Sequence, residues 1–357
     1  MEVVLGPFGM QSPHPYRRSH ADMYEDLITT AQKAEEFGYD GIALTEHSFW
    51  YDGYCPSLQP TLASVAQHTS RIKLVTGALL LPQHDPLKVA EEAAVLDRLS
   101  HGRLVLGLGV GYRPEEFHGH GVEIGRMGAR FLEAYEVVRR ALTQETFSYE
   151  GEFYQYHNVS LKTRPWQQEI PMWVCAGFTE WSIKAAARRG WSYCTTGDMD
   201  GGGAIFQRYD EFAESFGHPP EKLKRALFRD VFVMPTQEEA DIIMEQDYWA
   251  AMNDQFFGFG FLREKNPDGS QMTEVPPPMK EMMLNNRLAR PRGTPAMVRE
   301  HLAPILDWNI DMLIARMNWA NFTLERGLRS AEVFARDVMP MLRQTTVEKQ
   351  TFEGPAQ

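Results

Sequence analysis

The chain has 357 residues, of which 43% are hydrophobic and 24% are charged, and this composition is ordinary for a globular protein with a large core. Its formal net charge of -12 argues against binding to nucleic acid or to an anionic membrane, because both need clustered basic side chains. No apolar run approaches the length of a membrane span, the N-terminus lacks a basic signal segment, and the three cysteines form no C-x-x-C pair, so we expect a cytoplasmic protein.

Short apolar runs alternate with helical patterns along the whole chain. The predicted strands span residues 2–9, 40–47, 71–81, 104–108, 170–177, 190–197, 226–234 and 311–318. The predicted helices span residues 21–37, 57–69, 86–100, 126–145, 179–189, 203–217 and 324–339. Eight strands with helical crossovers predict an α/β fold, a single (β/α)₈ TIM barrel over residues 1–344. An open doubly wound sheet would need a phosphate-binding fingerprint after the first strand, and the sequence there has none.

Two segments do not fit an ideal barrel. Residues 146–165 alternate aromatic and polar side chains, which predicts a hairpin inserted before the fifth strand. Residues 247–293, between the seventh and eighth strands, are rich in Gly, Pro and Met and only weakly periodic. A long loop of this kind is typical of a lid, and we expect residues 257–271 to close over the barrel mouth. Residues 345–357 are expected to form a flexible C-terminal tail.

The stretch "RLVLGLGVGY", residues 103–112, places glycines at alternate positions at the end of an apolar run. A dinucleotide-binding turn needs G-x-G-x-x-G leading directly into a helix. The spacing of Gly107, Gly109 and Gly111 does not fit, and the following "RPEEFHGHGVEIG" is not expected to continue as a helix. We interpret the stretch as a buried strand whose glycines allow close approach of the backbone to a ligand, or a tight turn.

Active sites of TIM barrels lie at the C-terminal ends of the strands. The second strand ends in "TEHSFWYDGY". Side chains alternate along an extended chain, so we expect His47 and Glu46 to point to opposite faces. We expect Glu46 to be a structural residue. The fifth strand ends in "AGFTEWS", whose free backbone N–H groups suit a phosphate, although Thr179 would equally serve as a plain helix cap. The histidines at 118 and 120 have no partners at metal-binding spacing, so we predict no metal site.

Taken together, these motifs resemble the bacterial luciferase-like flavin monooxygenase family. The most specific match is residues 76–122, and "LTEHSF" (44–49) and "EIPMWVCAGFTEWSIKAAARRG" (169–190) also resemble family motifs. The resemblance implies a (β/α)₈ barrel, often a dimer, that binds reduced FMN or a deazaflavin coenzyme at the C-terminal ends of its strands. The "GLGVGY" stretch would then form the floor beneath the flat isoalloxazine ring.

The resemblance also implies roles for single residues. His47 matches the family's catalytic histidine. The implied cofactor-binding residues lie at the ends of the third, fourth and fifth strands: Thr76, Gly77, Ala78, Gly109, Val110, Gly177, Phe178 and Thr179. Of these, Gly77 and Ala78 match a non-proline cis peptide bond in relatives, and the last three match the phosphate loop.

This chain departs from the family pattern at two positions. Ser48 stands where the luciferases have a second histidine. Val110 stands where many FMN-using relatives have an arginine that helps to neutralise the phosphate. The second departure is compatible with weaker FMN binding, with substitution by Arg113, or with a deazaflavin coenzyme.

The resemblance implies a two-component monooxygenase. A separate flavin reductase would supply reduced FMN, which with dioxygen would oxygenate a small organic substrate, and the aromatic side chains near the mouth favour an apolar or aromatic one. Two alternatives stay open: a dehydrogenase or reductase that uses a deazaflavin coenzyme, and a non-catalytic flavin-binding partner subunit. We also expect a homo-oligomer, most simply a homodimer.

Overall fold

The computed structural model describes residues 1–11, 18–50, 53–177, 179–196, 203–258, 268–270, 272–317 and 323–343. The parallel strands that follow the predicted order are β1 (Glu2–Phe8), β2 (Gly41–Leu44), β3 (Lys73–Leu80), β4 (Leu104–Gly109), β7 (Met172–Cys175), β8 (Ser192–Thr195), β9 (Arg225–Asp230) and β12 (Met312–Arg316). They form a closed barrel in the order β1-β12-β9-β8-β7-β4-β3-β2, which confirms the predicted TIM barrel.

The helices that follow these strands match the predicted helices to within a few residues. They are α1 (His20–Phe37), α2 (Leu58–His68), α3 (Pro86–Leu99), α5 (Met127–Thr143), α6 (Glu180–Ala187), α7 (Ala204–Ser215), α11 (Pro295–Leu302) and α12 (Leu324–Asp337). Of this set, α11 was not predicted. In the part of the chain that the structure describes, no helix is long and apolar enough to cross a membrane.

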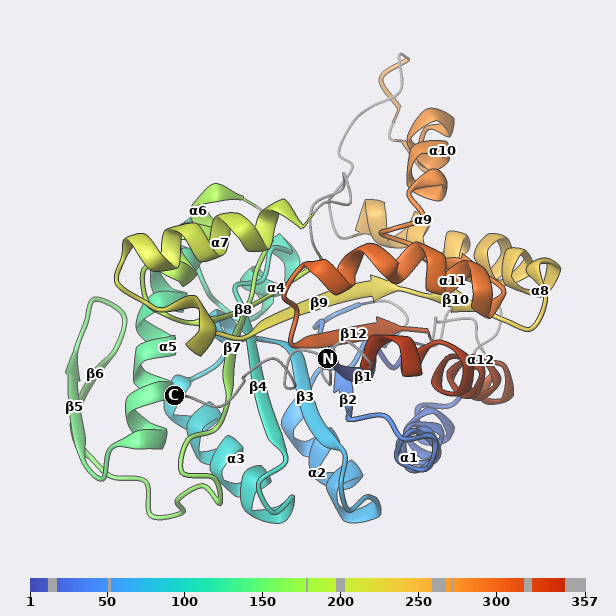
Figure 1. Cartoon of the computed structure of the whole chain (residues 1–357). Helices are drawn as coiled ribbons and strands as arrows, with labels where there is room; N and C mark the ends of the chain where they lie inside the picture. Colours follow the sequence, from blue (N-terminus) through green and yellow to red (C-terminus); the bar gives the residue numbers. More distant parts are fainter. Residues whose placement is uncertain are drawn as a thin grey trace, which may run out of the picture. The chain divides into compact units, whose positions relative to one another are not determined.

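The chain divides into two compact units, and the unit made of Pro7–Glu35 and Gly41–Ala176 carries β2, β3, β4 and β7. In this unit the parallel register pairs Leu44 with Thr76 and Leu80 with Gly109. The register of β3 against β4 shifts between Thr76 and Leu79, and the Gly77–Ala78 peptide bond within that shift is cis, as expected. Helices α2, α3 and α5 lie side by side along these strands (Figure 1).

The second unit is made of Met1–Gly6, Glu36–Asp40 and Gly177–Gln357 and carries β8, β9, β12 and most of β1. Its register pairs Val3 with Leu313 and Leu313 with Leu227. The apolar face of α12 is buried within the same unit, where the Tyr39 hydroxyl donates a hydrogen bond to the carbonyl oxygen of Ala331 at 2.8 Å.

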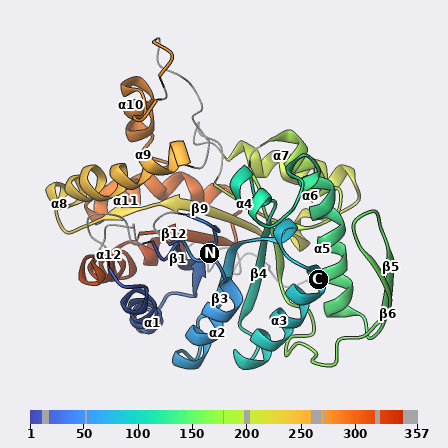
Figure 2. The same cartoon turned by 180° about the vertical axis from the view of Figure 1, so that it is seen from behind.

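The predicted hairpin is present in the first unit. Strands β5 (Phe147–Glu150) and β6 (Gln155–Val159) pair antiparallel and run along the outer side of α5 (Figure 2). The predicted seventh strand, by contrast, divides after Asp230. Its end forms β10 (Phe232–Val233), which pairs with β11 (Arg292–Gly293) in a separate small sheet.

Two predictions about irregular segments were wrong. Residues 114–119 form the short helix α4 (Pro114–Gly119), because a proline at the first helical position and two glutamates in the first turn favour a helix start. The 247–293 insertion is also largely helical where it is described. It contains α9 (Trp249–Gly258) and α10 (Pro277–Asn285), and α8 (Gln237–Ile242) and a π-helical turn, η4 (Ile243–Tyr248), precede them.

These extra helices have a core of their own. Ile243, Met244, Tyr248 and Met252 pack with Phe232 in one buried cluster. Burial of an apolar face stabilises a helix even where the sequence period is weak, which explains the difference from the prediction. Most of the predicted lid, residues 259–267 and 271, lies outside the described residues, as does the whole predicted tail.

Candidate active site

His47 and Glu116 form a buried pair beyond the C-terminal end of β2. His47 Nδ1 lies 2.8 Å from Glu116 Oε1, and the Glu116 residue, on α4, has 0% exposure. The same oxygen accepts hydrogen bonds from the backbone N–H of Ser48 at 2.9 Å and from Arg113 Nη1 at 3.3 Å. Burial raises the pKa of Glu116, but these hydrogen bonds and the charges of His47 and Arg113 outweigh it and hold the pKa below its usual value. Glu116 therefore stays an ionised acceptor.

The other ring nitrogen of His47 contacts Tyr112. The Tyr112 hydroxyl lies 3.2 Å from His47 Nε2, and the ring of Tyr54 packs edge-on against the imidazole at 4.7 Å between centroids. An ionised carboxylate only accepts hydrogen bonds, so His47 Nδ1 donates to Glu116. Tyr112, which meets the other ring nitrogen, is at the surface with 38% exposure. Tyr112, His47 and Glu116 thus form a hydrogen-bonded chain from the surface to a buried carboxylate.

Arg113 stabilises the His47–Glu116 pair from its buried side. Its residue is only 4% exposed, and its guanidinium donates from Nη1 to the Ser48 carbonyl oxygen at 2.9 Å and lies 4.8 Å from the centre of the Trp50 ring. The sequence left Arg113 open as a replacement for the phosphate-binding arginine. In the structure its guanidinium contacts Glu116 and the segment after β2.

A second histidine–carboxylate pair lies next to the first. Glu46 is buried, and its Oε1 lies 2.7 Å from His84 Nε2. Burial lowers the pKa of His84, but the hydrogen bond and charge of Glu46 outweigh this effect and raise it. The adjacent residues Glu46 and His47 therefore have different partners, and their orientation to opposite faces stays a prediction. Within the described residues, no group of three or more His, Cys, Asp and Glu side chains could hold a metal ion.

The cofactor-binding residues predicted on β3 and β4 lie against each other. The Thr76 hydroxyl donates to the Gly107 carbonyl oxygen at 2.7 Å. A Cβ atom on Gly107 would come within 2.0 Å of the Thr76 carbonyl oxygen, and one on Gly109 within 3.1 Å of the Ala78 Cβ. These two glycines therefore allow β3 and β4 to approach each other at the cis bond. Val110 is half-buried and directly follows β4.

The predicted phosphate loop belongs to the second unit. Thr179 caps α6, its hydroxyl accepting from the Ser182 backbone N–H at 3.3 Å, so the helix cap that the sequence allowed is present. Gly177 and Thr179 are both exposed, and a Cβ atom on Gly177 would meet no atom within 4 Å. Phe178 lies outside the described residues. A phosphate at this loop stays a prediction.

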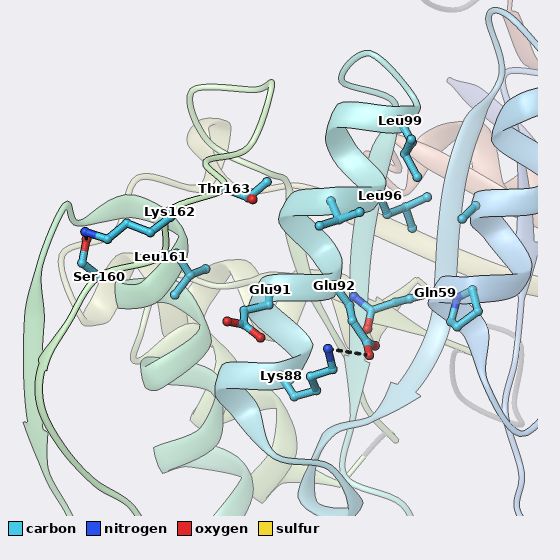
Figure 3. Close-up of a pocket in the computed structure, with 13 residues that line it drawn as sticks. Gln59, Lys88, Glu91, Glu92, Leu96, Leu99, Ser160, Leu161, Lys162 and Thr163 are labelled. Atoms are coloured by element: carbon cyan, nitrogen blue, oxygen red, sulfur yellow. Dashed lines mark hydrogen bonds and ion pairs between the residues drawn. The ribbon is translucent and has the colours of Figure 1, made fainter.

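A surface cavity of about 460 Å³ opens elsewhere on the first unit, between α2, α3 and residues 160–163 (Figure 3). Apolar side chains of α3, among them Leu96 and Leu99, line it together with the Lys88–Glu92 ion pair, which spans 3.6 Å. None of the predicted site residues lines this cavity. It is therefore separate from the candidate active site.

Sequence reasoning missed two contributors to this arrangement and one buried side chain near it. Glu116 was assigned to a segment with no expected helix, and it lies 69 positions from His47 in the sequence, so no local pattern could pair them. Tyr112 ends the "GLGVGY" stretch that was expected beneath the flavin ring, but it was not paired with His47. Gln83, at the end of the 3₁₀ turn η1 (Leu81–Gln83), was not considered at all, although its buried amide follows β3 directly.

Comparison with known proteins agrees with the fold. The sequence profile of the luciferase-like monooxygenase family matches residues 5–310. The solved structure of the monooxygenase RslO1 from Streptomyces bottropensis superposes with a TM-score of 0.82 at 25% identity, covering 95% of this chain and 99% of that chain.

Two further proteins differ in their cofactor. The oxygenating constituent of 3,6-diketocamphane monooxygenase from Pseudomonas putida, in complex with FMN, has a TM-score of 0.74 at 21% identity, covering 95% of this chain and 99% of that chain. An F420-dependent glucose-6-phosphate dehydrogenase from Kineococcus radiotolerans is 30% identical over 237 residues, 64% of this chain and 69% of that protein. The chain spans about half the length of the curated relatives that match it first.

The closed (β/α)₈ barrel places a histidine–carboxylate pair beyond the C-terminal end of β2, where proteins of this fold carry their active sites. The chain belongs to the luciferase-like monooxygenase family.

Proposed function

We propose that this chain is a flavin-dependent monooxygenase that uses reduced FMN, supplied by a separate reductase, and dioxygen to oxygenate a small apolar or aromatic compound. The observation that carries the proposal is the Tyr112–His47–Glu116 chain of hydrogen bonds beyond β2. The family of the chain and its likeness to the monooxygenase RslO1 support the reaction class.

The residues present fit a flavin. The Gln83 amide is buried beside Gly111 without a hydrogen-bond partner among the described residues, as expected of a group that binds a ligand. The exposed loop of Gly177 and Thr179 offers backbone N–H groups at a helix start, which suits the phosphate. Thr76 to Ala78, Gly109 and Val110 would line the ring. When bound, reduced FMN supplies the electrons and the reaction with dioxygen.

His47 would act as the acid–base residue. Glu116 fixes the ring and keeps the Nδ1 hydrogen in place, so Nε2 is the atom that exchanges a proton with the reacting groups. Tyr112, hydrogen-bonded to that atom and exposed at the surface, can return the proton to solvent. The carboxylate also stabilises the positive charge that the imidazole gains when Nε2 is protonated.

A deazaflavin-dependent dehydrogenase or reductase is the second candidate. The observation that favours it is Val110, together with the commitment of Arg113 to Glu116, because neither position offers a cation for the FMN phosphate. The similarity to an F420-dependent dehydrogenase agrees with this alternative. A non-catalytic flavin-binding subunit would have no need of a histidine held by a buried carboxylate, and that pair argues against it.

The deciding experiment is an anaerobic titration with reduced FMN and, separately, with reduced F420, followed by isotopically labelled dioxygen and a panel of apolar and aromatic compounds. We expect saturable binding of reduced FMN and a product that carries one labelled oxygen atom. Binding of F420 alone, with hydride transfer and no labelled oxygen in the product, would establish the second candidate instead. Binding of either flavin with no turnover of any compound would favour the non-catalytic subunit.

The remaining expectations belong to the same proposal. We propose a homo-oligomer, which light scattering of the purified chain would test. We also propose a cytoplasmic location, because Cys55, Cys175 and Cys194 are all free thiols.

A further inference from the structure

Gln83 is a buried polar side chain with nothing to bind. Its residue is 7% exposed, and neither Nε2 nor Oε1 has a hydrogen-bond partner among the residues that the structure describes. Burying an amide without partners is unfavourable, so such groups in a native protein call for a physical explanation. Gln59 on α2 provides the contrast, because its buried Nε2 donates to the Val89 carbonyl oxygen at 3.1 Å.

Gln83 stands at the end of the two strands that carry the predicted ring-binding residues. Leu80 pairs with Gly109 in the register of β3 and β4, and beyond this pair Gln83 Nε2 lies 3.2 Å from where a Cβ atom on Gly111 would stand. The Phe117 ring lies equally close to that position, and Phe117 follows Glu116, the partner of His47. The amide therefore lies near Gly111, which follows β4, and near Phe117 on α4, the helix that carries Glu116.

A carboxamide presents one donor and one acceptor side by side in a plane. Its complement is a lactam edge, in which an N–H stands next to a carbonyl, and glutamine reads such paired edges of nucleobases with two hydrogen bonds. The pyrimidine ring of a flavin has this edge, and the deazaflavin coenzyme has the same one. A phosphate or an apolar substrate offers no such pattern.

We propose that the Gln83 carboxamide binds the lactam edge of the flavin's pyrimidine ring and so fixes the orientation of the ring relative to His47. The inference rests on the proposed function in requiring a flavin, but it holds equally for FMN and for the deazaflavin coenzyme. Gln83 is in this sense a cofactor-binding residue that no sequence motif singled out.

The test begins with binding of reduced FMN and reduced F420 to the wild-type chain under anaerobic conditions, followed by Gln83→Leu. We expect this variant to raise Kd for whichever flavin binds by about tenfold, equivalent to about 1.4 kcal/mol. Its ligand-free melting temperature should stay equal or rise, because an unpartnered amide has been replaced by an apolar side chain. The matched variant Gln59→Leu, which loses a made hydrogen bond, should lower the melting temperature and leave Kd unchanged.

A ligand variant identifies the edge. FMN methylated at N3 cannot donate from the lactam, so we expect it to bind wild type about tenfold more weakly than FMN. In Gln83→Ala, which leaves room for the methyl group, the two ligands should bind equally. Methylation of N3 and Gln83→Ala together form a double-mutant cycle. Its coupling energy measures the contact between N3 and Gln83, because each change alone removes that contact.

Three results would overturn the inference. If wild type binds neither flavin, the proposed function fails and this inference with it. If wild type binds a flavin and Gln83→Leu binds it with the same Kd, the inference alone fails. If Gln83→Leu does not fold, the inference is decided by Gln83→Ala, in which an unchanged preference for FMN over its N3-methyl form overturns it.

Discussion

Replacing Glu116 by glutamine should slow turnover strongly while flavin affinity stays almost unchanged. Glu116 Oε1 accepts from His47 Nδ1 at 2.8 Å, from Ser48 N at 2.9 Å and from Arg113 Nη1 at 3.3 Å. Glutamine has nearly the same shape, but its oxygen carries no negative charge, so it neither fixes the tautomer of His47 nor stabilises a protonated ring. Because loss of such a group costs about 10²- to 10⁴-fold in rate, we expect kcat to fall by about 10²-fold or more.

The same variant should be less stable, in a way that depends on pH. Arg113, which is 4% exposed, would lose its ion pair with Glu116, and breaking a buried ion pair costs about 3 kcal/mol. The pKa of Glu116 lies below its usual value, so its contribution to stability is complete above the pKa of an unfolded glutamate. That contribution is lost as the pH falls through the lower folded-state pKa. The difference in unfolding free energy between wild type and variant should therefore be largest near neutral pH and shrink on acidification.

Glu115→Gln is the matched control, because Glu115 is exposed in the first turn of the same helix. Flavin affinity is measured by anaerobic titration, turnover by oxygen uptake with the substrate found above, and stability by urea unfolding between acid and neutral pH. The reasoning is refuted if Glu116→Gln turns over within twofold of wild type, or if Glu115→Gln loses as much.

Three further outcomes are expected. His47→Ala should bind reduced FMN normally and lose turnover by about 10²-fold or more, and near-normal oxygen uptake in that variant would make His47 a spectator. Thr179→Glu should weaken flavin binding by repulsion of the phosphate without unfolding the barrel, and an unchanged Kd in the anaerobic titration would place the phosphate elsewhere. Glu46 raises the pKa of His84, so this pair stabilises the fold fully below the pKa of an unfolded histidine and loses that contribution as the pH rises through the folded-state value. His84→Gln should remove this part of the pH dependence in urea unfolding, and an unaltered profile would contradict the assigned pair.

The barrel could be predicted because it follows from local patterns, and the fold in turn predicts where its active site lies. Strand β4 is a continuous apolar run, and His47 stands at a strand end, where the fold puts its chemistry. Glu116 could not be paired with His47 in the same way, because glycines surround α4 in the sequence and its orientation depends on Arg113 and Ser48. Gln83 could not be predicted for a different reason. The lack of a hydrogen-bond partner is visible only once the surrounding atoms are placed.

Which coenzyme the chain prefers should depend on how its residues neutralise the negative charge of the cofactor phosphate. An arginine at position 110 would bring a full positive charge, but the chain has valine there, and the Arg113 guanidinium is buried against Glu116, Ser48 and Trp50. The charge of Arg113 helps to keep Glu116 ionised, because a buried carboxylate is costly without a nearby positive charge. Releasing Arg113 toward a phosphate would therefore disrupt the pair that holds His47. The predicted loop of Gly177 and Thr179 is left to bind the phosphate through backbone dipoles, a weaker attraction than a full charge. Affinity for the flavin should then depend more on ring contacts, and the proposed contact of the Gln83 amide would contribute to it equally for both candidate coenzymes.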